Sequence, residues 1–381
     1  MDIVVTILLL ILVLGILVFI HELGHFLAAR IVGATVYEFA LGYGPKLISK
    51  KIKGTEYSIR LLPLGGFVKI LGDGDFGKKG EKELKKEDRE GNLKNKSKLA
   101  QIFVMLAGII MNILLAIVAY SIMLGFSDWK VNLSYEFEDF KPLGATIVRE
   151  REIDVPYQVL EGSLAEASGM PGEGYIKNIN NEFVEYIEDI SRLIEGNDTV
   201  VIEACDLDSV CNEYNVVVGD DGKIGIAIGS NYYISINYSN HKIFSGFSHL
   251  INNTRLISRV FTDLFKEAKD TGDYSTLSNS VSGPVGMFFL IDYFKELGWV
   301  PFIALIADLS LSLAFMNIFP IPALDGGRVL ILLIESVLGK DLNPRVEALI
   351  INLSFILLMV FVVVVMIKDI VNINELKSLF E

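Results

Sequence analysis

The sequence predicts a multi-pass α-helical membrane protein with about four transmembrane helices, a membrane-associated β-hairpin and an inserted α+β domain. Hydrophobic residues make up 51% of the 381 residues, which is too apolar for an ordinary soluble enzyme. These residues gather in four long runs rather than spreading evenly. A polar and acidic stretch of the length of a soluble domain separates the second run from the third.

Each apolar run is long enough to cross the hydrocarbon core of a bilayer, which is about 30 Å thick. The first run lacks the basic start and the small-residue cleavage site of a signal peptide, so we expect it to be retained as a helix. The predicted spans are residues 1–32, 99–126, 299–319 and 348–367.

The charge distribution predicts the orientation of the chain and its partners. The net charge of −13 excludes nucleic acid, whose binding needs a basic face. Lysine and arginine gather in residues 30–98, whereas the insert after Phe126 is acidic. Cytoplasmic loops carry the excess of Lys and Arg, so we expect residues 30–98 to lie on the cytoplasmic side of the cell membrane. The N-terminus, the insert and the C-terminus then lie outside, and the lipid bilayer is the surrounding partner.

The loop after the first span predicts a β-hairpin or small sheet joined directly to a membrane helix. Residues 55–61 alternate between apolar and polar side chains, as a strand does. Breakers flank this strand at Gly44-Pro45 and at Gly65-Gly66, where we expect a turn. The following residues, 72–98, are rich in charge and predict a solvated cytoplasmic loop.

The insert predicts a small α+β domain. Its residues 162–170 read GSLAEASGM and lead through Gly174 into the apolar run YIKNIN at residues 175–180. Over residues 143–229 this pattern resembles a PDZ domain of the bacterial, circularly permuted type. The expected strands are 144–153, 157–160, 175–179, 200–204 and 216–218, with a helix at 186–195.

Cys205 and Cys211 are the only cysteines, and they flank a short polar turn between two predicted strands. On the outside of the membrane a hairpin disulfide is expected for such a pair. Two unpaired thiols remain the alternative. The pair makes a poor zinc site without further ligands.

The first apolar run carries His21-Glu22-Leu23-Gly24-His25, a His-Glu-x-x-His pattern. On a helix, residues four apart share a face, so both imidazoles can bind one zinc ion. Glu22 beside them is placed to take a proton from an attacking water. Ionisable side chains at membrane depth are costly and usually serve a function, so the pattern predicts metal catalysis.

A catalytic zinc needs a third protein ligand, and the other two histidines lie in or near the insert. The best candidate is Asp325, in the segment NIFPIPALDGG at residues 317–327. Pro320 and Pro322 break the third membrane helix there. Gly326-Gly327 allows a close approach of the backbone, so Asp325 can face a metal at an opened helix end.

These motifs resemble those of the site-2 protease family of intramembrane metalloproteases, in the bacterial group that carries a PDZ insert. The resemblance spans almost the whole chain and is supported by Gly108-x-x-x-Asn112 in the second span and by SGPVG at residues 282–286. Two positions depart from the family pattern, because Ile109 replaces a proline and Ser312 replaces an asparagine. Neither departure touches the metal, and both lie at positions that the resemblance associates with substrate contact.

The resemblance implies a Zn²⁺ cofactor held by His21, His25 and Asp325, with Glu22 as the catalytic base. It implies that Asn317 holds or unwinds a substrate helix. An exposed strand within residues 55–70, with Gly65-Gly66 at its turn, is implied to bind substrate through its edge, and a purely structural hairpin is the alternative. Asn112 either lines the same cavity or makes a polar contact between helices.

The predicted function is therefore zinc-dependent hydrolysis of peptide bonds in the transmembrane segments of single-pass membrane proteins, such as anti-sigma factors, or of remnant signal peptides. Two alternatives are a non-catalytic PDZ membrane scaffold and a metal transporter. Asp308, an acid in the third span, either faces the catalytic cavity or makes a packing contact. The predicted domains are 1–126, 127–242 with the PDZ-like part, an amphipathic linker at 243–297, and 298–381 with the last two spans.

Overall fold

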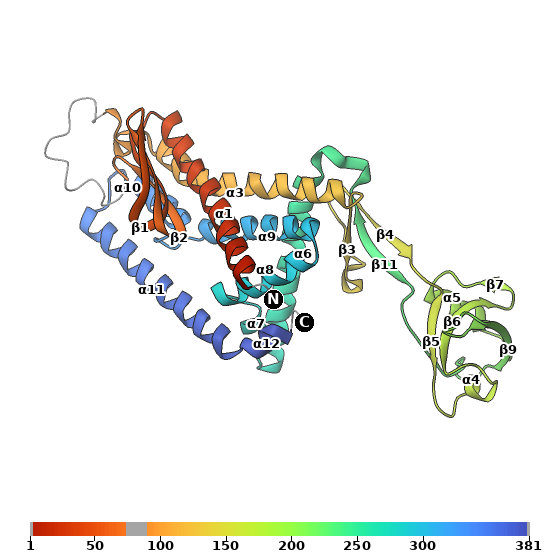
Figure 1. Cartoon of the computed structure of the whole chain (residues 1–381). Coiled ribbons are helices and arrows are strands. Elements are labelled where there is room, and N and C mark those ends of the chain that lie inside the picture. Colours follow the sequence, from red (N-terminus) through yellow and green to blue (C-terminus); the bar gives the residue numbers. More distant parts are fainter. Residues whose placement is uncertain (1–2, 74–89, 379–381) are drawn as a thin grey trace. The chain divides into compact units, whose positions relative to one another are not determined.

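The computed structural model describes residues 3–73 and 90–378 (Figure 1). Most of the loop predicted at residues 72–98 therefore lies outside the described residues. The chain forms two compact units, the first made of Met1–Phe126 and Ile243–Glu381 and the second of Ser127–Lys242.

The first unit is mainly helical. Its elements are α1 (Ile3–Ile31), β1 (Val36–Ile52), β2 (Thr55–Ile70), η3 (Leu93–Asn95), α3 (Lys98–Phe126), α6 (Ser245–Thr271), α7 (Ser275–Asn279), α8 (Pro284–Glu296), α9 (Trp299–Ile318), α10 (Asp325–Leu338), α11 (Pro344–Val371) and α12 (Ile373–Ser378). In the described part of the chain α1, α3, α9 and α11 are long and apolar enough to cross a membrane, close to the four predicted spans.

The spanning helices differ in how much protein surrounds them. Val13 and Leu17 of α1 are buried in a cluster with Ile291 of α8 and Leu305 of α9. Only Val365 and Asp369 of α11 are buried, and most of the other residues of that helix are exposed. α11 begins at Pro344, ahead of the predicted span, because the Asn343 side chain caps its first turn by accepting a hydrogen bond from the Arg345 amide.

The predicted hairpin is present, but its pairing is more elaborate than a simple ribbon. β1 and β2 run beside α1 (Figure 1). The first part of β1 pairs with both halves of β2, since Phe39 lies opposite Tyr57 and also opposite Val68. The last part of β2, from Gly66 to Ile70, pairs only with β1 in the described residues and so forms one edge of the sheet.

The predicted amphipathic helix is α6, which packs against α3 through its small and polar side chains. Ser245, His249 and Asn252 are buried, whereas the apolar residues Phe247 and Phe265 are exposed. One face of this helix therefore packs on α3, while the apolar residues Phe247 and Phe265 remain exposed.

The second unit contains two sheets. Its elements are β3 (Lys130–Leu133), η4 (Tyr135–Phe137), β4 (Thr146–Arg151), β5 (Val155–Val159), α4 (Leu164–Ala167), β6 (Glu173–Ile179), β7 (Glu182–Phe183), α5 (Ile187–Ile194), β8 (Thr199–Cys205), β9 (Cys211–Val217), β10 (Ile226–Ile228) and β11 (Tyr232–Asn237), and η5 (Ser239–Phe244) leads out of it. One sheet has the order β10-β5-β6-β8-β9 with β7 beside β6, and the other has the order β3-β11-β4. Cys205 and Cys211 form a disulfide across the β8–β9 hairpin, which decides between the two alternatives for these cysteines.

Candidate metal centre

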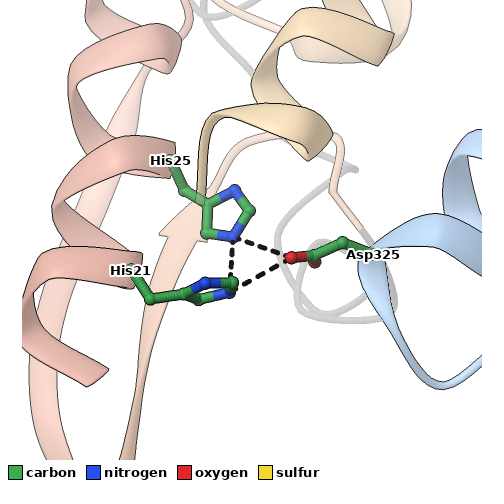
Figure 2. Close-up of side chains that lie close together, drawn as sticks. All are labelled: His21, His25 and Asp325. Atoms are coloured by element: carbon green, nitrogen blue, oxygen red, sulfur yellow. Dashed lines mark hydrogen bonds and ion pairs between the residues drawn. The ribbon is translucent and has the colours of Figure 1, made fainter. Parts of the chain in front are cut away.

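Three side chains from two distant segments converge in the first unit. His21 and His25 project from one face of α1, and Asp325 is the first residue of α10 (Figure 2). The Nε2 atoms of the histidines are 3.2 Å apart. Asp325 Oδ2 lies 3.1 Å from Nε2 of His21 and 3.3 Å from Nε2 of His25. These atoms form the group in the described residues that could hold a metal ion.

The dimensions of this group fit zinc. Two ligand atoms about 2.1 Å from a tetrahedral zinc ion lie roughly 3.4 Å from each other, close to the three distances found here. Asp325 Oδ2 is buried and forms no hydrogen bond within the described structure. A buried carboxylate oxygen needs a partner, and a bound cation would satisfy this one. Two imidazoles and one carboxylate also make a ligand set used by catalytic zinc sites.

Helix α3 supplies the surroundings of both imidazoles. Val104, Gly108 and Asn112 follow one another at four-residue intervals and therefore share a face of α3. The Val104 carbonyl oxygen lies 2.8 Å from Nδ1 of His25, and the Asn112 amide lies 3.2 Å from Nδ1 of His21. Gly108 sits between them against the rings, so the absence of a side chain there makes room for the histidines.

The broken end of α9 brings Asp325 to the histidines. α9 ends at Ile318, and α10 begins at Asp325 after a short segment with two prolines. A Cβ atom on Gly326 would lie 2.2 Å from the Ile318 carbonyl oxygen, and one on Gly327 would lie 2.1 Å from that of Ile321. The close approach expected of these two glycines is therefore confirmed, and it holds the start of α10 against the end of α9.

A cavity of about 760 Å³ opens beside the three donors. Glu22 lines it together with His21, His25 and Asp325. The carboxylate of Glu22 accepts a hydrogen bond from the backbone N–H of Val68 on the edge of the sheet. Gly66 also packs directly on this side chain, since a Cβ atom there would lie 3.2 Å from Glu22 Cγ. The edge of the sheet and the candidate base thus border the same space.

Several lining residues were missed by the sequence reasoning. Tyr43 donates a hydrogen bond from its hydroxyl to the Gly66 carbonyl oxygen at 3.1 Å. Arg60 donates to Glu38 at 2.7 Å. Burial raises the pKa of Glu38, but hydrogen bonds from Arg60 and Ser58 outweigh it and lower that pKa overall. Asn352 of α11 also lines the cavity, and a polar side chain inside a spanning segment was a signal that could have found it.

The residues predicted to bind substrate do not all line the cavity. Gly65 and Gly66 lie beside Tyr43 and Glu22, next to the cavity. Asn317 is partly buried in the last turn of α9 and is not among the described residues that line the cavity. Asn112 is fully buried against His21.

Asp308 takes part in a packing contact between helices. The Tyr120 hydroxyl of α3 donates a hydrogen bond to its carboxylate. The Asn253 amide of α6 donates to the same oxygen at 2.8 Å. Asp308 therefore joins α3, α6 and α9, and it is not among the described residues that line the cavity beside the three donors. This arrangement agrees with the packing role that the sequence left open.

Comparisons with known proteins agree with this geometry. The family model described as Peptidase family M50 matches residues 9–361. A protein of Clostridium acetobutylicum is 32% identical over 95% of this chain and 96% of its own length. Its name describes it as a zinc metalloprotease by provisional assignment. The regulator of sigma-W protease RasP of Bacillus subtilis is 27% identical over 96% of this chain and 98% of its own length. The zinc metalloprotease RasP of Bacillus licheniformis shows the same identity and coverage.

Proposed function

The chain belongs to peptidase family M50 and is a zinc metalloprotease of the site-2 protease type, and on this basis we propose that it cleaves transmembrane segments of single-pass membrane proteins. The observation that carries the proposal is the position of Glu22. This carboxylate borders a three-donor metal centre on α1, a helix long and apolar enough to cross a membrane. Hydrolysis would therefore take place below the surface of the bilayer.

In this proposal His21, His25 and Asp325 hold the zinc ion, with Asp325 as the third ligand. When bound, Zn²⁺ supplies Lewis-acid activation of water and of the scissile carbonyl group. Glu22 accepts the proton of the attacking water and then gives it to the leaving amine. The support is the fit of the donor triangle and the place of Glu22 on the wall of the same cavity.

The substrate is proposed to bind as an added strand on the edge formed by residues 66–70. A helical substrate hides its amides in hydrogen bonds, so the segment to be cleaved must become extended. The Leu71 N–H donates a hydrogen bond to the Thr35 carbonyl oxygen. Backbone groups alternate in direction along a strand, so the N–H and C=O groups of odd-numbered residues point toward β1. Even-numbered residues then direct their backbone groups outward, and the bond from Val68 N–H to Glu22 agrees with this. An extended peptide pairing there would pass beside the base.

Other residues take supporting roles in this proposal. Gly66 keeps the strand close to α1, since a Cβ atom there would lie 3.0 Å from Val18 Cγ1, and Gly65 leaves room for the Tyr43 ring, which would lie 2.6 Å from an added Cβ atom. Asn317 stands at the broken end of α9, where it would hold or unwind the entering substrate helix. Asn352 lines the cavity from α11.

We propose that the second unit is an extracytoplasmic PDZ-containing domain that admits substrates whose outer domain has already been trimmed. The support is the sheet β10-β5-β6-β8-β9, whose core includes Ile176, Ile202 and Val216, together with α4 and α5. Strand β4 pairs with β11 in the separate sheet, so the PDZ-like part would begin at β5. The Cys205–Cys211 disulfide and the acidic charge agree with a location outside.

The proposed substrates are single-pass membrane proteins such as anti-sigma factors, or signal peptides left after secretion. The name of the Bacillus subtilis relative, regulator of sigma-W protease, motivates the first class. Both classes offer one apolar helix that could enter beside α11, whose surface is mostly exposed.

A Glu22→Gln variant tests the proposal against a PDZ scaffold and a metal transporter. Wild type and variant are purified, and their zinc content and their cleavage of a reporter transmembrane segment are measured side by side. We expect the variant to keep its zinc and to lose cleavage, because only proton transfer is removed. Cleavage by the variant at the wild-type rate would overturn the assigned mechanism. A zinc-loaded wild type that moves zinc across vesicles without cutting any reporter would favour transport.

A further inference from the structure

Asn112 is enclosed by protein on all sides and faces one of the candidate zinc ligands. Its side chain is 0% exposed, and its Nδ2 atom lies 3.2 Å from Nδ1 of His21. Its Oδ1 atom is buried and has no hydrogen-bond partner in the described structure. A buried amide oxygen without a partner costs about 1–3 kcal/mol, so this arrangement needs an explanation.

The chemistry of a metal-bound imidazole supplies one. The Nε2 atom of His21 points to Asp325 and His25, so a metal ion there would use the Nε2 lone pair. The ring proton must then reside on Nδ1, which becomes a donor and requires an acceptor. An amide nitrogen cannot accept a hydrogen bond, whereas an amide oxygen can. Turning the Asn112 amide over exchanges the two atoms, which gives Nδ1–H its acceptor and Oδ1 its partner.

We propose that Asn112 is a positioning residue that accepts a hydrogen bond from Nδ1–H of His21 and thereby holds its Nε2 lone pair toward the zinc ion. The inference rests on the proposed zinc chemistry of the same site. His25 has the matching arrangement, because its Nδ1 lies 2.8 Å from the Val104 carbonyl oxygen. One face of α3 therefore supplies an acceptor for each of the two imidazoles.

The position of Asn112 is itself fixed from a third helix. The Ser310 hydroxyl of α9 donates a hydrogen bond to the Asn112 backbone carbonyl oxygen at 2.8 Å. Both Ser310 and Asn112 are fully buried. Helices α3 and α9 thus form a rigid support, and a rigid acceptor limits rotation of the His21 ring.

Two substitutions separate this role from simple packing. Asn112→Leu keeps the size of the side chain but removes the acceptor, whereas Asn112→Asp keeps an acceptor in the same place. Loss of such a partner weakens metal affinity by about 10–100-fold. We expect that loss for Asn112→Leu, and zinc affinity close to wild type for Asn112→Asp. The affinity is measured on purified full-length protein by competition with a chelator of known zinc affinity, without reference to cleavage.

A matched control and a spectroscopic readout complete the test. Asn317→Leu, which changes a proposed substrate contact, should leave zinc affinity unchanged. The chain has only four histidines, so ¹⁵N-labelled histidine resolves the His21 ring, and we expect its proton on Nδ1 in the zinc-loaded protein. Wild-type zinc affinity in folded Asn112→Leu, or equal losses in the Leu and Asp variants, would overturn the inference. Absence of zinc binding in the wild type would instead refute the proposed function.

Discussion

Gly108 of α3 lies so close to His25 of α1 that a Cβ atom added to it would be 2.5 Å from the Nε2 atom of the histidine. The same Cβ atom would be 2.8 Å from Nε2 of His21. These are the two nitrogen atoms proposed to bind zinc, so a single methyl group would enter the space of the metal centre. The small residue at this position is therefore explained by the site rather than by helix packing alone.

Gly108→Ala is predicted to weaken zinc binding and abolish cleavage while leaving the protein folded in the membrane. The matched control is Gly15→Ala in α1, where an added Cβ atom meets nothing within 4 Å. Zinc content and reporter cleavage are measured for both variants. Normal zinc binding by Gly108→Ala would mean that the rings do not need the space beside α3.

The proposed substrate edge predicts a specific crosslink. A cysteine at Lys69, on the edge next to the cavity, should form a disulfide with a cysteine in the reporter transmembrane segment. The experiment uses the Glu22→Gln background so that the substrate is not consumed, and the native cysteines are already paired. A cysteine at the exposed Ile48, in the part of β1 that pairs with Ile59 at the far side of the sheet, serves as the control. Equal crosslinking at both positions would remove the support for strand addition.

Asn352→Leu is predicted to lower kcat/KM for the reporter by about 5–10-fold, as expected when one hydrogen bond to an unwound substrate is lost. Zinc content should not change, because Asn352 lines the cavity from α11 and is not part of the donor group. Ser354→Ala is the matched control, since the Ser354 hydroxyl already bonds to the Ile350 carbonyl oxygen of its own helix at 2.9 Å. If the two variants cleave equally well, Asn352 has no part in substrate binding.

His249 predicts a pH dependence of stability. Burial lowers the pKa of this histidine from 6.5 to about 4, so the folded protein keeps it neutral. Between these values the unfolded chain binds a proton that the folded chain does not, so the free energy of unfolding falls as the pH falls. The contribution is on the order of 3 kcal/mol.

A His249→Phe variant keeps a ring beside Tyr120 but cannot titrate. Its thermal unfolding midpoint in detergent should fall less than that of wild type between pH 6.5 and pH 4.5. Parallel curves for the two proteins would show that His249 is not held neutral by the fold.

Local sequence patterns predicted the parts of this protein that depend on neighbouring residues. The four apolar runs predicted four helices long enough to cross a membrane, and the spacing of His21 and His25 predicted their shared helix face. Spacing alone could not place Asp325 beside His21 and His25. That prediction also needed the interpretation of Pro320 and Pro322 as a break in a helix at membrane depth.

Long-range contacts were beyond the sequence patterns. Strand β11 pairs with β3 and β4 on either side of it, and none of these pairings leaves a local signal that distinguishes partners. The double pairing of Phe39 was missed because an alternating strand does not reveal which neighbour it meets. The contact of Asn112 with His21 depends on how α1 and α3 cross. The sequence therefore could not decide whether Asn112 lines the cavity or makes a polar contact between helices.

Zinc retention by an Asp325→Asn variant tests the central claim most directly. Wild type, Asp325→Asn and Asp308→Asn are purified, dialysed against a mild chelator and assayed for zinc per chain. Asp308 is the matched control because its carboxylate also lies between helices, where Tyr120 and Asn253 donate hydrogen bonds to it, but it is outside the donor group. We predict that wild type and Asp308→Asn keep one zinc ion and that Asp325→Asn loses it. Full zinc retention by Asp325→Asn would contradict a metal centre shared between α1 and α10.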